Sequence, residues 1–167
     1  MNAAVPSRPT VLDATVLSNF AYLEQVDALQ VLPRPIAVAA VRDEIAAGVE
    51  AYTFLANAID ALEETIPVVT LVDETRALAE TLGDRLDRGE AESLAVAEIH
   101  DGLLVTDDGA ARSLARERGV GLTGSIGVMI ELVDRNRIDE TTADAWLKRL
   151  IDETDYRAPS RELSTYR

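Results

Sequence analysis

The stretch LLVTDDGAAR, residues 103–112, leads from an apolar run through two adjacent aspartates into a segment that favours a helix. The run GLLVT (102–106) has the length and apolar content of a buried β-strand. Asp107 and Asp108 follow that strand directly, and α/β proteins bind their ligands beside the carboxyl ends of their strands. The stretch therefore predicts an α/β fold with acidic side chains at its functional edge.

Apolar runs and helical patterns alternate along the rest of the chain. The runs at 10–14, 36–38, 67–72 and 120–124 predict strands, and the segments between them carry helical patterns. Strands that alternate with helices pair in parallel, with helices on both faces of the sheet. We therefore predict a three-layer α/β/α sandwich with a central parallel sheet. The expected helical segments are 16–23, an apolar-periodic segment through Val31, 40–64, 74–86, 88–100, 109–119, 126–136 and 140–154.

Length and composition restrict the class of protein. The chain has 167 residues, 47% hydrophobic and 28% charged, which predicts a single domain over 1–154 and an extended, polar C-terminal tail over 155–167. There is no cysteine and one histidine, His100, so zinc–thiolate and multi-histidine sites are excluded and oxygen must hold any metal. Because no signal peptide or run of 18 apolar residues is present, we expect a cytoplasmic protein without a membrane partner.

The chain is strongly acidic. Thirty acidic residues face 16 basic ones for a net charge of −14, and Lys148 is the only lysine. Acidic surfaces with scarce lysine suit a cytoplasm rich in salt, where screening shortens the reach of self-repulsion, and this favours a halophilic source. The alternative is an acidic surface made for a basic partner. The spread of acids over nearly every helix favours the first explanation.

Four segments bring acids toward one edge of the predicted sheet. Asp13 follows the apolar part of the first strand, Asp107 and Asp108 follow the fourth, and Glu44 lies early in the helix after the second. Carboxylates that converge repel one another unless a cation lies among them, so Mg²⁺ or Mn²⁺ is the expected cofactor. The alternative is that each aspartate caps a helix and that Glu44 is a solvated helix acid.

The segment RGEAES (88–93) supplies the remaining acid. Glu90 shares a helical stripe with Leu94 and Ala97 and therefore faces the core side, whereas Glu92 lies about 200° away around the helix. We predict Glu90 as the inward acid and keep Glu92 as its alternative.

Two further motifs concern phosphate chemistry. LDATV (12–16) begins like the nucleophile loop of haloacid-dehalogenase-type phosphatases, but Thr15 stands where that family needs a second aspartate. TGSIG (123–127) starts a helix, so its N–H groups are candidates for binding a phosphate. The alternative for TGSIG is a helix N-cap made by Thr123 or Ser125.

Four stretches together resemble a known family. VLDATVLSNFA, VAAVRDEI, RGEAESLAVAEI and LLVTDDGAARSLARERGVGLTGSIGVMIELV look like a PIN domain over roughly residues 10–140. By position, the resemblance assigns the four metal-binding and catalytic acids of the family to Asp13, Glu44, Glu90 and Asp108, with Asp107 as a close rival to Asp108. It also matches Thr106 to a hydroxyl at the strand end, and it departs from most toxin members in having glutamate rather than aspartate at position 90.

The resemblance implies a function. PIN domains are usually divalent-metal-dependent ribonucleases, and many prokaryotic members are VapC-like toxins held inactive by a cognate antitoxin. It therefore implies an endoribonuclease with RNA as substrate and an antitoxin as a candidate partner. The alternative is a PIN-like binding or assembly module without catalysis. The apolar content of VEAYTFLANAIDAL (49–62) further suggests a homodimer.

Overall fold

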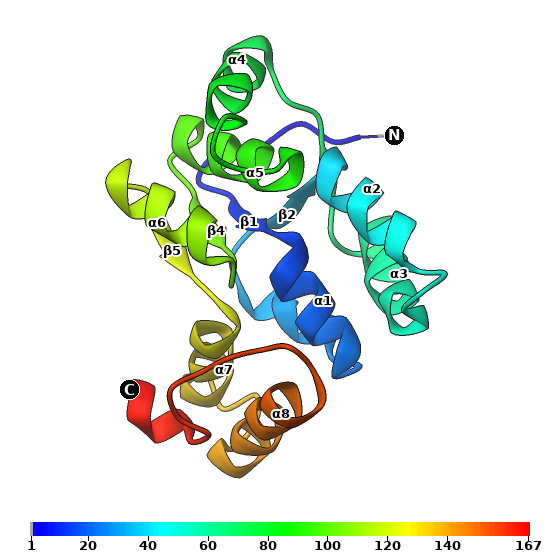
Figure 1. Ribbon diagram of the computed structural model, residues 1–167, viewed down its shortest axis with the longest axis vertical. Helices are drawn as coiled ribbons and strands as arrows, with labels where there is room; N and C mark the ends of the chain where they lie inside the picture. Colours follow the sequence, from blue (N-terminus) through cyan, green and yellow to red (C-terminus); the bar gives the residue numbers. More distant parts are fainter. Residues whose placement is uncertain (1) are drawn as a thin grey trace.

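The computed structural model describes residues 2–167 and contains a five-stranded, all-parallel sheet (Figure 1). The strand order is β3-β2-β1-β4-β5, so the chain builds outward from the central strand β1 first to one side and then to the other. The predicted α/β/α sandwich with a parallel sheet is confirmed. The strands are β1 (Thr10–Leu12), β2 (Pro35–Val38), β3 (Val68–Val69), β4 (Leu103–Val105) and β5 (Gly121–Thr123).

The point where the winding direction reverses lies between β1 and β4. Leu12 pairs with Val105, and Val105 pairs with Thr123, so these three strands end level with one another. Asp13 continues this alignment, because its backbone N–H donates to the carbonyl of Val105 at 2.9 Å. In open α/β sheets this reversal leaves a crevice at the carboxyl ends of the strands, which is where ligands bind.

Eight α-helices surround the sheet in the part of the chain that the structure describes. Helix α5 packs across β1, β2 and β4, while α6 and α7 contact β5 (Figure 1). Phe20, Leu104 and Met129 are fully buried between the layers. The helices are α1 (Ala14–Tyr22), α2 (Ala39–Gly48), α3 (Ala56–Glu64), α4 (Asp73–Leu82), α5 (Arg88–Ile99), α6 (Gly109–Glu117), α7 (Ser125–Asp134) and α8 (Glu140–Glu153), with 3₁₀ segments at Val26–Val31, Thr53–Leu55 and Leu163–Tyr166.

The single helix expected over 40–64 is wrong, because the chain turns between α2 and α3. A Cβ at Gly48 would lie 2.8 Å from Cδ1 of Leu55, so glycine allows α3 and its 3₁₀ entry to fold back closely against α2. The apolar residues Leu55, Ala58 and Leu62 are buried inside the domain. Packing within the chain thus accounts for most of the apolar content that suggested a homodimer.

The strand expected over 67–72 is shorter than predicted, and the N-terminal segment covers it. Only Val68 and Val69 form β3, since the Thr70 N–H donates instead to the carbonyl of Ala3 at 3.1 Å. Ala3 also forms a parallel bridge with Val69. This contact occupies part of an edge strand that would otherwise present unpaired backbone groups.

Residues 155–167 are not extended, so that part of the expectation is wrong. The segment runs back over α7 and α8, where Leu163 is fully buried and its N–H donates to Asp144 at 2.7 Å. The Tyr166 hydroxyl accepts the N–H of Ser160 at 2.7 Å and closes a short turn. The buried Leu163 side chain thus fixes the conformation of an otherwise polar segment.

Between residues 2 and 167, no helix combines the length and apolar content needed to cross a bilayer.

A candidate carboxylate site at the sheet edge

Asp13 and Thr106 lie side by side at the ends of β1 and β4. Asp13 is 2% exposed and Thr106 is fully buried, and the Thr106 hydroxyl donates to Oδ2 of Asp13 at 2.6 Å. The same hydroxyl oxygen accepts the backbone N–H of Asp108 at 3.1 Å. One threonine therefore links the acid that follows β1 to the start of α6.

Thr15 extends this link toward α1. Its hydroxyl oxygen accepts the Asp107 N–H at 2.9 Å and lies 3.3 Å from the hydroxyl oxygen of Thr106. Because the Thr106 proton is directed to Asp13, the Thr15 hydroxyl is the donor between the two threonines. Two hydroxyls in series thus orient the Asp13 carboxylate, and each bond polarises the next.

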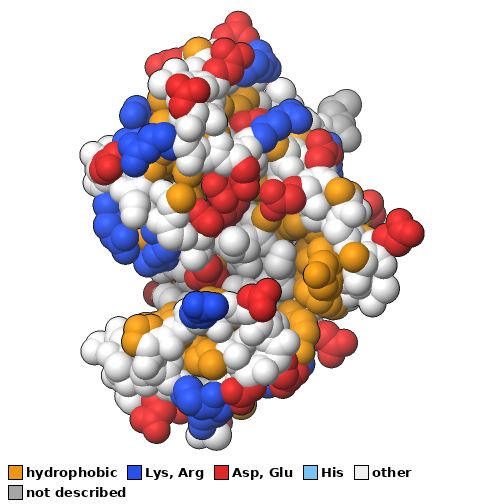
Figure 2. Space-filling model, viewed as in Figure 1, with side chains coloured by type: hydrophobic (Ala, Val, Ile, Leu, Met, Phe, Trp, Pro, Cys, Tyr) orange, Lys and Arg blue, Asp and Glu red, His pale blue; other side chains and the backbone are white. Residues whose placement is uncertain are grey.

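Four more acids come from three helices near Asp13. Glu44 comes from α2, Asp108 is the N-cap of α6, and Asp87 and Glu90 form the reciprocal capping box at the start of α5. Figure 2 shows Asp and Glu side chains gathered near the middle of the face, between α5 and α2. We call Asp13, Glu44, Asp87, Glu90 and Asp108 the acidic cluster.

Burial and neighbouring negative charge raise the pKa values of three cluster members. Burial, opposed by the Thr106 hydrogen bond and reinforced by Asp87 and Asp108, raises the pKa of Asp13 to about 6. Partial burial, then Asp87 and Asp13, raise the pKa of Glu44. Burial, a hydrogen bond to Asp87, and the charges of Asp87 and Asp108 raise the pKa of Glu90 to about 8. These mutual effects identify the five acids as one electrostatic unit.

Asp87 was missed by the sequence prediction. It precedes Arg88-Gly89-Glu90 and fits the pattern of an N-cap acid followed three residues later by glutamate. Its carboxylate accepts the Glu90 N–H at 2.8 Å, and the Glu90 carboxylate accepts the Asp87 N–H at 3.3 Å. The capping-box signature could have located this acid at the start of α5.

Asp107 lies beside the cluster but has a different environment. Its carboxylate accepts hydrogen bonds from Asn19 Nδ2 at 2.8 Å, from the Ser125 N–H at 2.8 Å and from the Ser125 hydroxyl. These three donors come from α1 and α7. Asp107 therefore holds the start of α7 against the sheet edge, while Asp108 belongs to the acidic cluster.

The TGSIG segment (123–127) was expected either to offer its N–H groups to a phosphate or to cap the helix through Thr123 or Ser125, and its hydrogen bonds in the structure match neither arrangement. The N-cap of α7 is Gly124, without a side-chain cap, and the Asp107 carboxylate from the end of β4 takes the Ser125 N–H expected for a phosphate. A Cβ at Gly124 would collide with Oδ1 of Asp107 and lie 2.9 Å from Nη1 of Arg112. Neither Thr123 nor Ser125 caps the helix, because a carboxylate from outside the segment does so.

Gly124→Ala should lower the free energy of unfolding by about 1–3 kcal/mol, the usual cost of forcing an extra methyl group into a packed site. The methyl group would push Asp107 and Arg112 apart and loosen the start of α7. Urea denaturation of wild type and variant measures the difference. Gly109→Ala is the control, since nothing lies within 4 Å of a Cβ at that N1 position. Equal loss in both variants would contradict this account.

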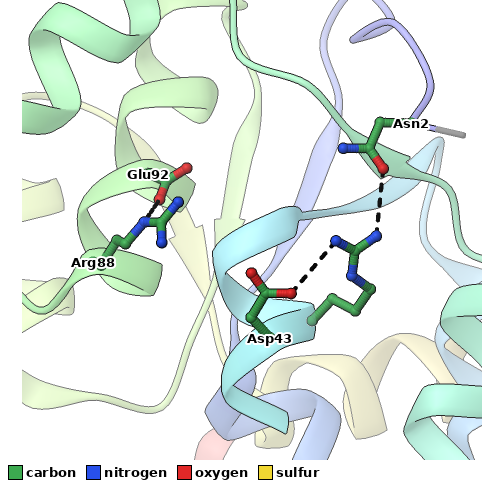
Figure 3. A network of polar contacts seen from close by, with 5 residues as sticks. Asn2, Asp43, Arg88 and Glu92 are labelled. Carbon is green, nitrogen blue, oxygen red and sulfur yellow. Dashed lines mark hydrogen bonds and ion pairs between the residues drawn. The ribbon is translucent and has the colours of Figure 1, made fainter. Parts of the chain in front are cut away.

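Glu92 points away from the acidic cluster. Its carboxylate accepts a hydrogen bond from Nε of Arg88 at 2.8 Å, as Figure 3 shows. It also lines a hollow together with Arg76 and Glu80 of α4. The same figure shows the Arg42 guanidinium between Asn2 and Asp43, and it donates a hydrogen bond to each. Asp43 is therefore paired with Arg42 and not with the cluster.

The donor set of the acidic cluster fits a hard divalent cation. All the candidate ligands are carboxylate oxygens, which Mg²⁺ and Mn²⁺ prefer. Gly89 lets α5 pack closely against α2 beside these acids, because a Cβ there would lie 3.3 Å from Cγ2 of Val41. Within residues 2–167, no three His, Asp or Glu side chains already converge closely enough to hold an ion.

The parallel sheet, with acidic side chains beside its reversal point, defines an α/β domain with a candidate oxygen-donor site. This chain belongs to the PIN domain family, whose model, described as a PIN domain, matches residues 9–166. PIN domains are generally nucleases that act on nucleic acid with divalent metal ions. No curated protein matches the chain at a significant level of similarity.

Proposed function

We propose that this protein is a Mg²⁺- or Mn²⁺-dependent endoribonuclease that hydrolyses RNA phosphodiester bonds in the cytoplasm. The observation that carries the proposal is the acidic cluster at the reversal point of the sheet. Its members come from four separate parts of a chain that belongs to a nuclease family. Asp13 is buried while the other four acids are exposed or half-buried, and their like charges repel one another, so a bound cation would stabilise the cluster.

Asp13, Glu44, Glu90 and Asp108 would hold the ion, and Asp87 joins them as an acid that the sequence did not indicate. A bound divalent ion lowers the pKa of a water molecule and stabilises charge on phosphoryl oxygens. Thr15 and Thr106 keep the Asp13 carboxylate in one orientation through their hydroxyls. Asp107 positions α7 and leaves the opening beside the cluster in a fixed shape.

A toxin role in a toxin–antitoxin pair is the second candidate. The acidic cluster has no arginine or lysine within ion-pairing distance of Asp13, Glu44, Asp87, Glu90 or Asp108 among residues 2–167. A small basic antitoxin that inserts an arginine there would form charge-assisted hydrogen bonds with several carboxylates at once. Co-purification of such a protein from the native host would support this role, and harmless overexpression of the free chain would contradict it.

Glu44→Gln should lower the rate of RNA cleavage by about 10-fold, because Glu44 is an exposed member of the cluster and loss of one supporting ligand typically costs 10–100-fold. Asp43→Asn is the matched control. Asp43 is the residue before Glu44, and its carboxylate pairs with Arg42 and not with the cluster, so the variant removes the same charge outside the cluster. Cleavage of a fluorescent single-stranded RNA is measured with Mg²⁺, with Mn²⁺ and with a chelator, over a range of KCl concentrations.

Equal rates for both variants would show that charge alone, and not the cluster, governs the reaction. Metal binding without cleavage of any RNA would favour the non-catalytic binding module. DNA cleaved as fast as RNA would overturn the assignment of RNA as substrate.

A further inference from the structure

A groove of about 420 Å³ lies beside the acidic cluster, between the β5–α7 junction and the C-terminal segment. Leu122, Ile126 and Ile130 give it apolar walls, while Tyr156, Arg112 and Arg157 supply an aromatic ring and two guanidinium groups. Its volume is within the range of pockets that take small organic ligands. The groove therefore combines surfaces suited to a flat ring and to an anion.

The groove adjoins a second hollow, of about 340 Å³, that reaches the acidic cluster. Glu44, Thr15 and Asn19 line this second hollow. Asp107 and Tyr156 line both. A chain molecule lying along the sheet edge would thus pass from Glu44, over Tyr156, to the two arginines.

Arg112 and Arg157 form no ion pair with a carboxylate in the described structure. Ten of the sixteen basic side chains lie within 4.0 Å of a carboxylate, and neither Arg112 nor Arg157 is among them in the part of the chain that the structure describes. Arg112 is half-buried and fixed, since Nη1 donates to the carbonyl of Thr106 at 2.9 Å. Its remaining N–H groups are free to meet an anion, and Arg157 stands exposed at the same groove.

We propose that this groove binds the nucleotide next to the scissile phosphate of a single-stranded RNA. Arg112 and Arg157 would hold its phosphate, because guanidinium groups match phosphate oxygens in geometry and charge. The Tyr156 ring and the apolar walls would contact the base, which requires an unpaired strand. The proposal rests on the proposed nuclease function and adds its substrate subsite.

The overall charge of the protein gives this groove its importance. A chain with a net charge of −14 repels a polyanion, and the acidic cluster repels a phosphate still more strongly at short range. Two cations without carboxylate partners, in the groove that adjoins the hollow lined by Glu44, offset that repulsion along the proposed path of the strand. The affinity for RNA should therefore depend more strongly on Arg112 and Arg157 than on other basic residues of the surface.

Arg157→Ala tests the groove, with Arg137→Ala as the control. Both arginines are exposed and have no carboxylate within 4.0 Å in the structure, but Arg137 does not line the groove. The variants change the net charge equally, so any difference between them is local. We expect Arg157→Ala to raise KM for a single-stranded RNA about 5–10-fold with kcat nearly unchanged, the pattern of lost uniform binding. Arg137→Ala should behave as wild type.

A second measurement does not depend on catalysis. Anisotropy of the fluorescent RNA with a chelator present gives the affinity, and its dependence on KCl should be shallower by about one counterion for Arg157→Ala. If Arg157→Ala weakens RNA binding as expected but the RNA is never cleaved, the proposal that the groove binds RNA is supported and the proposed nuclease function is contradicted. If RNA is cleaved while Arg157→Ala matches Arg137→Ala in KM and salt dependence, the groove is overturned. Equal competition by an acidic peptide would overturn the nucleotide assignment.

Discussion

Asp108→Asn should abolish Mg²⁺- or Mn²⁺-dependent RNA cleavage, lowering its rate by at least about 100-fold. Stabilisation of transition-state charge by a bound ion amounts to several kcal/mol, and about 1.4 kcal/mol corresponds to each factor of ten. Asp108 stands next to Asp13 through the shared Thr106 hydroxyl, and its charge raises the pKa values of both Asp13 and Glu90. Asparagine keeps the oxygen that caps α6 at the Ala111 N–H, so the fold should persist.

Asp107→Asn is the natural control for that variant, since it changes the neighbouring residue in the same chemical way. Its amide cannot accept all the hydrogen bonds that Asn19 and Ser125 now donate, so we expect reduced stability but substantial remaining activity. Initial rates are measured well below the melting temperatures of both variants. Wild-type activity in Asp108→Asn would mean that the chemistry lies elsewhere or that the cleavage comes from a contaminant.

Asp13→Asn should stabilise the metal-free protein at neutral pH by about 3 kcal/mol, which corresponds to roughly 6–12 °C in melting temperature for a domain of this size. The pKa of Asp13 rises from 3.8 to about 6 on folding, so the folded state holds its proton more tightly than the unfolded state. The contribution of Asp13 to stability is therefore complete below pH 4 and is lost as the pH rises through 6. Asparagine, which is never charged, avoids that loss.

Thermal melts of both proteins in a chelator, from pH 4 to pH 8, measure this effect. The two curves should converge near pH 4 and separate toward pH 7. Added Mn²⁺ should make wild type the more stable of the two proteins. At a Mn²⁺ concentration about 100 times Kd, binding should raise the free energy of unfolding of wild type by about 2.7 kcal/mol, while Asp13→Asn gains little. Calorimetric titration with Mn²⁺ gives the affinity directly. Identical Mn²⁺ binding by the two proteins would refute the metal site, and a variant less stable at every pH would refute the raised pKa of Asp13.

The alternation of strands and helices was predictable because each element carries its own local pattern. LLVT and TVLDA show apolar runs that only a buried strand explains, and the sheet followed from their spacing. The break between α2 and α3 was not predictable, since Gly48 sits in an unbroken helical pattern. Its role depends on Leu55, which approaches it only after the chain has turned back.

The candidate site also contains residues that could be predicted from the sequence and residues that could not. Strand ends can be recognised in the sequence, so the strand pattern alone predicted Asp13 and the pair Asp107 and Asp108 at one edge of the sheet, and the preference for Asp108 came from the family resemblance. The carboxylate of Asp107 was harder to assign, because its partners Asn19 and Ser125 lie far from it in the sequence and meet it only in the fold. Likewise, Tyr156 in the polar C-terminal segment reaches the site because Leu163 anchors that segment against α7 and α8.

The strand order has a consequence for how the protein is made. β1 is the first strand synthesised and the central strand of the sheet, but one of its two neighbours, β4, begins 93 residues later at Leu103. Asp13 is therefore separated from Thr106 and Asp108 until most of the chain has left the ribosome, and closing that long loop is a late and slow event in folding. A chain from which Asp108 has not yet left the ribosome cannot assemble the acidic cluster. The delay would keep a nascent nuclease from cutting the messenger that encodes it.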